Sequence, residues 1–314
     1  MMQKRRIERY WITLLVALFV GWLGVNAVWG LTGPDDTLVS GWMGQVAPPG
    51  VWLAGVFAVL ASIWVLSLRS PSNHGKAVRF AVLIVGAYLG GVAGFETLYR
   101  AVRPALGSTG VPATSIVDGL RFALHRSFML MPILPMVLVW RLGPRDLGRP
   151  VPLRFGDWST RTRVKLPLLG HVSWSWAFLI VAVFVGTPFF LVFQNQVGFE
   201  PITSGVLLRM APALLLMALA NGVVEEVVFR GFFLSALTPA TGIRAAVWLQ
   251  AIFFGLHHFG SSPVPMQALT TMLVSTLVGY LLGRSVVGTR GLGWAVLIHM
   301  MADLTFFSVT HVVW

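Results

Sequence analysis

Three short clusters in the last third of the chain carry carboxylates and imidazoles inside sequence that is otherwise apolar. The clusters are Glu225-Glu226-Val-Val-Phe-Arg230, Phe254-Gly-Leu-His257-His258 and His299-Met-Met-Ala-Asp303. A charged side chain at the centre of a bilayer costs roughly 2.5 to 3.5 kcal/mol on insertion scales, so such residues indicate chemistry or transport. Because carboxylates and imidazoles exchange protons with bound reactants, general acid–base catalysis is the first chemistry to consider.

The first cluster offers one carboxylate for proton transfer. Residues four apart on a helix are neighbours, so we expect the Arg230 guanidinium to neutralise Glu226. Glu225 is turned by about 100° toward another face of the helix. A carboxylate held in a desolvated cavity can accept a proton from water, as a general base must. The alternative for this cluster is a structural ion pair with a spare polar contact.

The second cluster is predicted to lie at the depth of the first. His258 lies about 21 Å along a helix from Arg244, and Glu225 lies about 18 Å from the inner end of its own span. Phe254, four residues before His258, shares its face and is expected to shield the ring. His257 points elsewhere by about 100°, so a structural role is favoured for it.

The third cluster presents His299 and Asp303 on one face of the last apolar segment, because they are four residues apart. They lie about 10 and 16 Å past Leu292, in the same inner half of the membrane as the other clusters. Glu225, His258, His299 and Asp303 can therefore converge. The alternative is a buried hydrogen bond that pins the terminal helix.

The composition is that of a membrane protein. Of the 314 residues, 56% are hydrophobic and 11% are charged, whereas about 25% are charged in a typical soluble domain. No cysteine is present, which excludes disulfides, thiolate metal sites and a cysteine nucleophile. A serine nucleophile is also disfavoured, since the chain contains no Gly-x-Ser-x-Gly elbow.

Apolar runs of about 20 residues predict an all-α fold, a polytopic transmembrane helical bundle of eight or nine spans. The candidate spans are 11–31, 51–68, 78–98, 119–140, 173–193, 208–237, 244–258, 267–283 and 292–312. The run at 119–140 could be short or re-entrant, because Asp118 and His125 lie in its first turns and Pro132 and Pro135 interrupt it.

The basic residues predict the orientation of the protein. With the N-terminus inside, most of the 23 Lys and Arg residues fall in inner segments, whereas the outer loops hold only Arg100 and Arg103. This pattern indicates an integral protein of the cell (plasma) membrane with a cytoplasmic N-terminus, in contact with the lipid bilayer. A nucleic-acid partner is disfavoured, because the formal charge of +12 forms no basic face with interleaved aromatic residues.

The chain is predicted to have three parts. Residues 1–140 form N-terminal transmembrane helices, 141–172 a basic cytoplasmic linker, and 173–314 a membrane domain that holds all three clusters. No internal repeat or inverted pair of interrupted helices, the mark of many transporters, is visible. Function is therefore expected in residues 173–314.

The order EExxxR, FxxxH, then HxxxN or HxxxD on successive membrane segments resembles the CPBP family of intramembrane proteases. This family is also called the CAAX-processing and bacteriocin-processing, or Abi, family. The resemblance covers roughly residues 173–314 and does not extend to residues 1–170. It implies a helical bundle around a catalytic cavity open toward the cytosol, and hydrolysis of peptide or protein substrates in the membrane that could be lipidated.

The resemblance also implies roles for individual residues. Glu225 and His258 would activate water, His299 and Asp303 would bind and polarise the scissile carbonyl, and Glu226, Arg230 and Phe254 would support them. Many family members have Asn at the position of Asp303, and an ionised aspartate cannot donate a hydrogen bond to an oxyanion. Asp303 is therefore protonated, or orients His299, or belongs to a metal site.

Two imidazoles and two carboxylates could also hold Zn²⁺ with an open position for water, and the family has been described as metalloproteases on that basis. The ligands would be Glu225, His258, His299 and Asp303. No HExxH helix is present, and a glutamate-activated water that requires no cofactor is the favoured mechanism.

Two other function classes remain as alternatives. A proton-coupled or ion transporter could use the same side chains as a pathway, but the polar residues do not continue to the outer face and repeat symmetry is missing. A non-catalytic membrane binding or immunity protein could keep the fold, although the intact motifs count against it.

Overall fold

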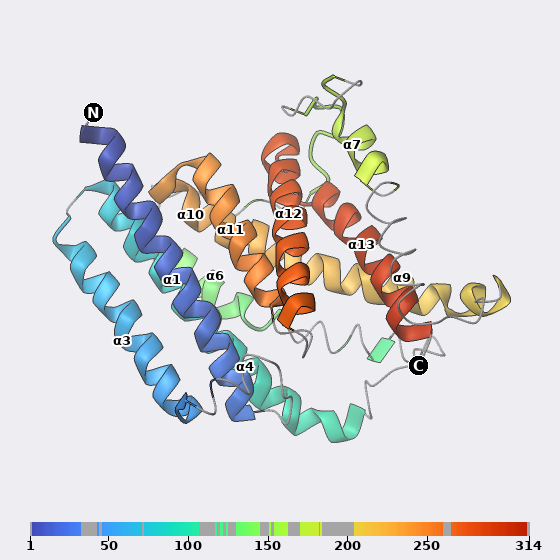
Figure 1. Cartoon of the computed structure of the whole chain (residues 1–314), viewed down its shortest axis with the longest axis horizontal. Coiled ribbons are helices and arrows are strands. Elements are labelled where there is room, and N and C mark those ends of the chain that lie inside the picture. The colour runs from blue at the N-terminus through green and yellow to red at the C-terminus, as the bar shows by residue number, and fades with distance from the viewer. Residues whose placement is uncertain are drawn as a thin grey trace. The chain divides into compact units, whose positions relative to one another are not determined.

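The computed structural model describes residues 2–32, 46–70, 72–106, 130–144, 154–162, 170–181, 204–259 and 265–312, with a few single positions between 43 and 183. Most of these residues are helical (Figure 1), and among them the β structure is one isolated bridge between Arg161 and Ser173. The all-α prediction is confirmed for this part of the chain. Asp118 and His125, in the predicted run at 119–140, lie outside the described residues.

The helical elements follow one another along the chain. They are α1 (Met2–Thr32), α3 (Pro49–Leu68), α4 (Asn73–Leu106), α6 (Ile133–Leu142), α7 (Trp174–Val181), α9 (Ser204–Glu226), the π-helix η3 (Val227–Phe233), α10 (Leu234–Thr241), α11 (Ile243–His258), α12 (Pro265–Thr289) and α13 (Gly293–Val312).

Among the residues that the structure describes, five helical stretches are long and apolar enough to cross a membrane. They are Tyr10–Val28, Pro49–Leu68, Asn73–Tyr99, Ala211–Thr241 and Pro265–Thr289. The described apolar parts of α6 and α13, Ile133–Leu142 and Gly293–Leu304, are shorter. The chain is thus an integral membrane protein, and the count of eight or nine spans stays a prediction.

The helices fall into two compact units, each made of several separate pieces of the chain. Unit 1 comprises Met1–Leu98, Met131–Pro150 and Val228–Gly283, and unit 2 comprises Tyr99–Leu130, Val151–Val227 and Arg284–Trp314. The domain boundaries predicted at residues 140 and 172 stay a prediction. The three motifs are divided between the units, so each unit is described by itself.

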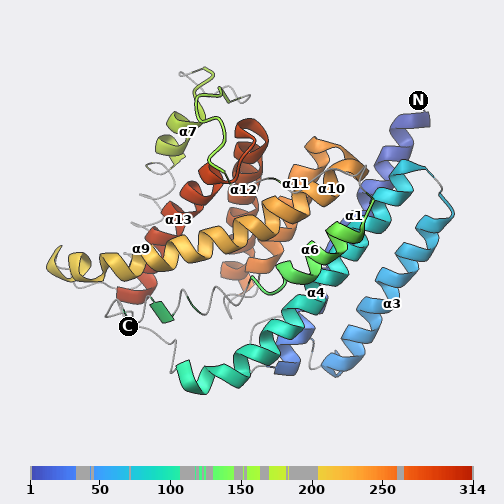
Figure 2. The ribbon, with the colours of Figure 1, turned by 180° about the vertical axis from the view of Figure 1, so that it is seen from behind.

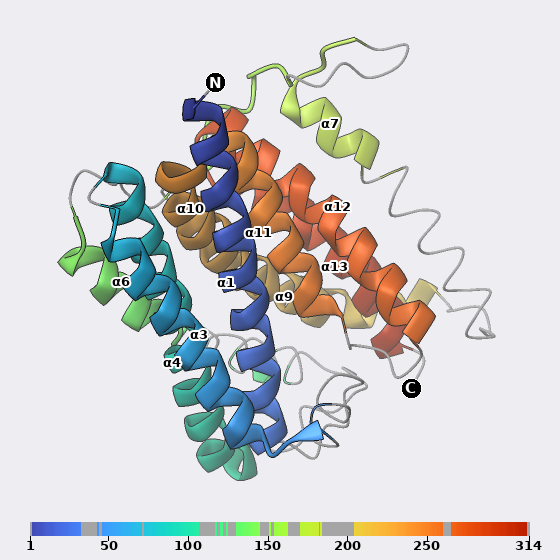
Figure 3. The ribbon, with the colours of Figure 1, turned by 60° about the vertical axis from the view of Figure 1, so that its left-hand side comes forward.

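Unit 1 is built from helices that pack through aromatic side chains. The helix α1 runs alongside α3 and α11 (Figure 3), and α6 lies along α4 (Figure 2) with the Phe80 and Trp140 rings 4.9 Å apart. The Phe233 and Phe253 rings meet edge to face at 4.8 Å. Edge-to-face pairs add to the free energy gained by burying the rings.

Unit 2 is built around the contact of α9 with α13. Gly222 on α9 faces α13, where an added Cβ would lie 3.4 Å from the Val296 carbonyl oxygen, so the backbones run close together there with room for at most a small residue. The start of α13 is also held by residues of the segment 154–162. The Gly293 N–H donates to the Arg154 carbonyl at 2.9 Å, and the Trp158 and Trp294 rings stack 6.4 Å apart.

The helix that carries the first motif changes type immediately after its two glutamates. It is α-helical to Glu226 and π-helical from Val227 to Phe233. The expected pairing of Glu226 with Arg230 assumed regular α-helical spacing through residue 230, which the structure does not have. Hydropathy is insensitive to this change, because both helix types satisfy their backbone hydrogen bonds internally.

Candidate active site

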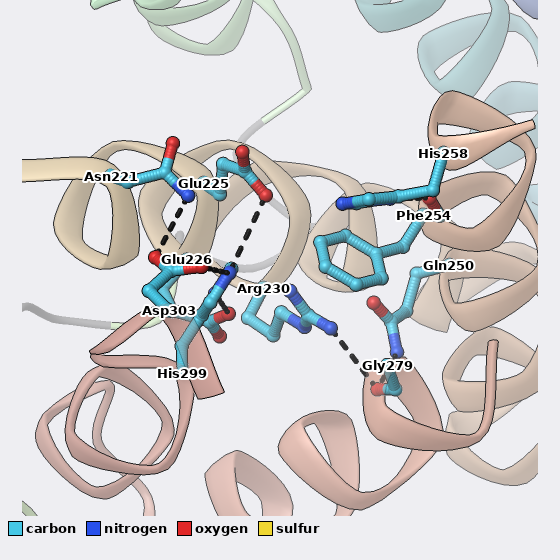
Figure 4. A network of polar contacts seen from close by, with 10 residues as sticks. All are labelled: Asn221, Glu225, Glu226, Arg230, Gln250, Phe254, His258, Gly279, His299 and Asp303. Carbon is cyan, nitrogen blue, oxygen red and sulfur yellow. Dashed lines mark hydrogen bonds and ion pairs between the residues drawn. The ribbon is translucent and has the colours of Figure 1, made fainter. Parts of the chain in front are cut away.

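His299 on α13 is the centre of a carboxylate cluster in unit 2. Its Nδ1 lies 2.8 Å from Glu226 Oε1, and its Nε2 lies 3.6 Å from Glu225 Oε2 and 3.8 Å from Asp303 Oδ1 (Figure 4). The consecutive glutamates of α9 therefore reach opposite nitrogens of one imidazole. The contact of Glu226 with His299 was not expected from the sequence, since it joins positions 73 residues apart.

The hydrogen bond to Glu226 fixes the direction of the His299 ring. An ionised carboxylate can only accept, so Nδ1 carries a proton and donates it to Glu226. The distances from Nε2 to Glu225 and Asp303 exceed those of a hydrogen bond. Nε2 is thus the ring atom turned toward the two remaining carboxylates, at ion-pair distance from each.

Burial divides the cluster into an enclosed part and a more accessible part. The Glu226 side chain is 0% exposed and the His299 side chain 5%, whereas Glu225 and Asp303 each keep 13%. Buried charges persist in proteins when they are paired, which Glu226 and His299 are. Glu225 and Asp303 are the carboxylates that a reactant could approach.

Asn221 is a member of this cluster that the sequence analysis missed. Its Nδ2 donates to Asp303 Oδ2 at 2.9 Å, which links α9 to α13 a second time. It lies one helical turn before Glu225 and is buried, with 5% exposure. The signal that could have found it is an amide four residues before the motif, on the same helix face.

His258 in unit 1 is held by its own helix. Its Nδ1 lies 2.8 Å from the Phe254 carbonyl oxygen, and its ring packs on the Phe254 ring at 4.6 Å, as their spacing predicts. A carbonyl oxygen only accepts, so Nδ1 carries a proton, and in its neutral form the ring has its lone pair on Nε2.

His257 is fixed in the same way but has a side-chain partner for its other nitrogen. Its Nδ1 donates to the Phe253 carbonyl at 2.9 Å, and its Nε2 lies 3.1 Å from the Tyr88 hydroxyl. The ring also meets Phe229 and Phe253 at 5.2 and 4.4 Å. These contacts fit the structural role expected for His257.

Arg230 is fully buried in unit 1, beside α11 and α12. Its guanidinium lies 4.4 Å from the Phe254 ring centroid, and its Nη2 donates to the Gly279 carbonyl at 3.2 Å. Gln250 donates to the same carbonyl at 2.9 Å. A Cβ at Gly279 would lie 3.0 Å from Phe254, so a larger residue there would force this group apart.

The structure therefore brings the predicted residues together in two sets. Glu225, Glu226, His299 and Asp303 meet in unit 2, whereas Arg230, Phe254 and His258 meet in unit 1. Two predicted contacts pair a residue of one unit with a residue of the other. They are the contact of His258 with Glu225 and the contact of Glu226 with Arg230, and both stay predictions.

The donor set can also be compared with the needs of zinc, whose nitrogen and oxygen ligands lie about 2.0–2.2 Å from the metal. In the part of the chain that the structure describes, no three His, Asp or Glu side chains are grouped as a metal site requires. The hydrogen bond from His299 Nδ1 to Glu226 is compatible with zinc, since a metal-bound histidine commonly donates its other N–H to a carboxylate. The predicted ligand set includes residues of both units, and zinc stays an alternative for experiment.

Comparison with known proteins bears on the same region. Residues 207–305 match the family model described as type II CAAX prenyl endopeptidase Rce1-like. No curated protein and no solved structure matches the chain. The matched segment contains all three motifs and the whole His299 cluster. As the motifs predict, residues 207–305 belong to the CPBP family of CAAX proteases.

Proposed function

We propose that the chain is a CAAX-type intramembrane endopeptidase that hydrolyses peptide bonds of membrane-associated substrates with a glutamate-activated water. The observation that carries this proposal is the buried His299, hydrogen-bonded to Glu226 and facing Glu225 within the segment that matches the protease family. A carboxylate can activate water as a general base, and an oriented imidazole can stabilise the oxyanion that forms when water adds to a carbonyl.

Glu225 is the general base in this reaction. Its carboxylate takes a proton from water, and the resulting hydroxide attacks the carbonyl carbon of the scissile bond. The tetrahedral intermediate then expels the amine, which receives the proton from the Glu225 carboxyl group. The products are one new carboxylate and one new amine, and Glu225 returns to its starting form.

His299 stabilises the oxyanion. With both nitrogens protonated, it donates from Nδ1 to Glu226 and from Nε2 to the carbonyl oxygen, where negative charge develops. Glu226 supports this role because it fixes the ring and compensates its charge. Asp303 lies on the Nε2 side at ion-pair distance, and its negative charge helps to orient the ring without accepting the Nε2 proton.

His258 is proposed to assist Glu225, on the strength of the second family motif. The hydrogen bond from His258 Nδ1 to the Phe254 carbonyl supports a role of His258 as a proton acceptor. With the Nδ1 position protonated, the lone pair of the neutral ring is on Nε2. Phe254 and Arg230 support the position of His258 from the same unit.

The substrate class proposed for the first assay is a peptide that ends in a prenylated cysteine followed by three residues. The family description, type II CAAX prenyl endopeptidase, supports this choice. A matched peptide without the prenyl group tests whether lipidation matters. A proteomic comparison of membranes from cells with the wild type and with Glu225→Gln would identify natural substrates.

The central test is Glu225→Gln in purified protein reconstituted in phosphatidylcholine and phosphatidylglycerol vesicles. The amide keeps the shape and loses the basicity, so kcat should fall by at least about 10²-fold while the protein stays folded. Glu96→Gln, the same exchange in α4, is the matched control and should cleave at the wild-type rate. Turnover above about a tenth of wild type in Glu225→Gln would remove the general-base assignment.

A further inference from the structure

We propose that Asn221 is a positioning residue that holds Asp303 at a distance from His299, so that the Nε2 proton remains available to the scissile carbonyl. This inference rests on the proposed function. Neither the sequence motifs nor the family match singles out Asn221. Its Nδ2 donates to Asp303 Oδ2 at 2.9 Å, and the other carboxylate oxygen, Oδ1, lies 3.8 Å from His299 Nε2.

The orientation of the Asn221 amide is set by chemistry. A carboxylate oxygen cannot donate to an amide carbonyl when it is ionised, so the NH₂ group must face Asp303 and the amide oxygen must face away. Figure 4 shows this oxygen turned to the side opposite Asp303. The amide oxygen is buried without a hydrogen-bond partner among the described residues.

An apolar residue would avoid the cost of that buried oxygen. Leaving an amide oxygen without a partner costs free energy, whereas two packed apolar side chains at a helix contact do not have this cost. A buried polar atom without a partner calls for an explanation, and a role in the site is one of those that native structures offer. The bond from the amide N–H to Asp303 supplies such a role here.

The need follows from the competition between Asp303 and the substrate for one proton. Charge-assisted hydrogen bonds between imidazolium and carboxylate are short and strong, and Asp303 is one helical turn from His299. Without the Asn221 bond, Asp303 could rotate, close the 3.8 Å gap and accept the Nε2 proton. The oxyanion would then lose its donor, which typically costs 10²–10³ in kcat.

The test compares Asn221→Leu with the exchanged pair Asn221→Asp/Asp303→Asn, using the prenylated peptide of the first assay in the same vesicles. The leucine variant should stay folded, lose about 10²-fold in kcat and keep its KM within about threefold. The exchanged pair restores a bond between an amide donor and a carboxylate acceptor, so it should recover at least about tenfold of the lost kcat. Asn26→Leu, the same exchange at a buried amide in the other unit, is the matched control and should keep the wild-type kcat.

A second measurement separates this inference from the proposed function. In ¹⁵N-histidine spectra of the full chain, the His299 Nε2 signal, assigned by its loss in His299→Gln, should move toward a hydrogen-bonded position in Asn221→Leu. If the wild type cleaves no peptide but the signal moves, the endopeptidase proposal fails and the positioning role survives. If the wild type cleaves and Asn221→Leu changes neither kcat nor the signal, Asn221 only pins the helices and the inference is wrong.

Discussion

The two units hold their histidines in opposite ways. His299 in unit 2 is fixed by a carboxylate from another helix, with Glu226 at 2.8 Å. His258 in unit 1 is fixed by the Phe254 carbonyl of its own helix at 2.8 Å. A carboxylate partner stabilises an imidazole that donates from both nitrogens, whereas a carbonyl partner is compatible with a ring that accepts at its other nitrogen. In the proposed function, His299 is accordingly a donor and His258 an acceptor.

The largest expected effect comes from removing the Nε2 donor of His299. In His299→Asn the amide keeps a donor near the Nδ1 position, toward Glu226, and places nothing at Nε2. We expect kcat to fall by about 10³-fold, the upper range for loss of one oxyanion donor. Single-turnover cleavage in vesicles measures it.

His299→Gln is the paired variant, because its amide reaches the Nε2 position. It should retain more activity than His299→Asn, by about tenfold. If the two variants were equally inactive or their order were reversed, Nε2 would not be the working atom, and the contrast between the two histidines would fail.

A smaller effect is expected at His258, where the ring is an acceptor that assists Glu225. His258→Asn should lower kcat by about 10²-fold, the lower range for a general acid–base group. His257→Asn makes the same change at the next residue and is the matched control. It should keep kcat within about threefold, because its Nε2 is already bound to Tyr88. Equal losses in both variants would indicate a general disturbance of α11.

The helices could be predicted from the sequence because hydropathy reports directly on burial in lipid. The predicted spans 244–258 and 292–312 differ from α11 and α13 by one residue at a single end. The helix α4 extends beyond the predicted span 78–98, since its ends carry polar residues that hydropathy leaves out. The π-helix at Val227–Phe233 could not be predicted, as its composition is that of an ordinary span.

The site could be predicted only in part, for a related reason. Spacing within a helix determines which side chains share a face, and it correctly grouped Phe254 with His258. The bond between Glu226 and His299 depends on how α9 packs on α13, which no local spacing contains. Asn221 was missed because an amide costs less in an apolar helix than a charge does, so it does not stand out.

Glu226 is expected to affect stability more than chemistry. Glu226→Gln replaces the acceptor of a buried, charge-assisted hydrogen bond, which should lower the free energy of unfolding by about 1.5–3 kcal/mol. Chemical unfolding in detergent micelles, followed by intrinsic tryptophan fluorescence, measures the change. The folded fraction should keep kcat within about tenfold. A normal stability with a kcat as low as that of Glu225→Gln would make Glu226 the base instead.

The smallest effect is expected from removal of metal. A zinc ion bound by His258 and His299 would make the two histidines equivalent ligands, and the contrast between donor and acceptor would disappear. In the metal-independent mechanism, a chelator such as EDTA should change kcat by less than about twofold, because the chain's own groups move every proton. Asp303→Asn should then be tolerated to within about tenfold, since an amide oxygen at position 303 still accepts from Asn221.

A metalloprotease mechanism would replace this one if active preparations contained stoichiometric zinc. The zinc and the activity would then be lost together in Asp303→Asn and after chelation, and added zinc would restore both. A chelator effect in preparations without bound zinc would instead reflect the vesicles, because EDTA also removes the divalent cations that bind anionic lipid headgroups.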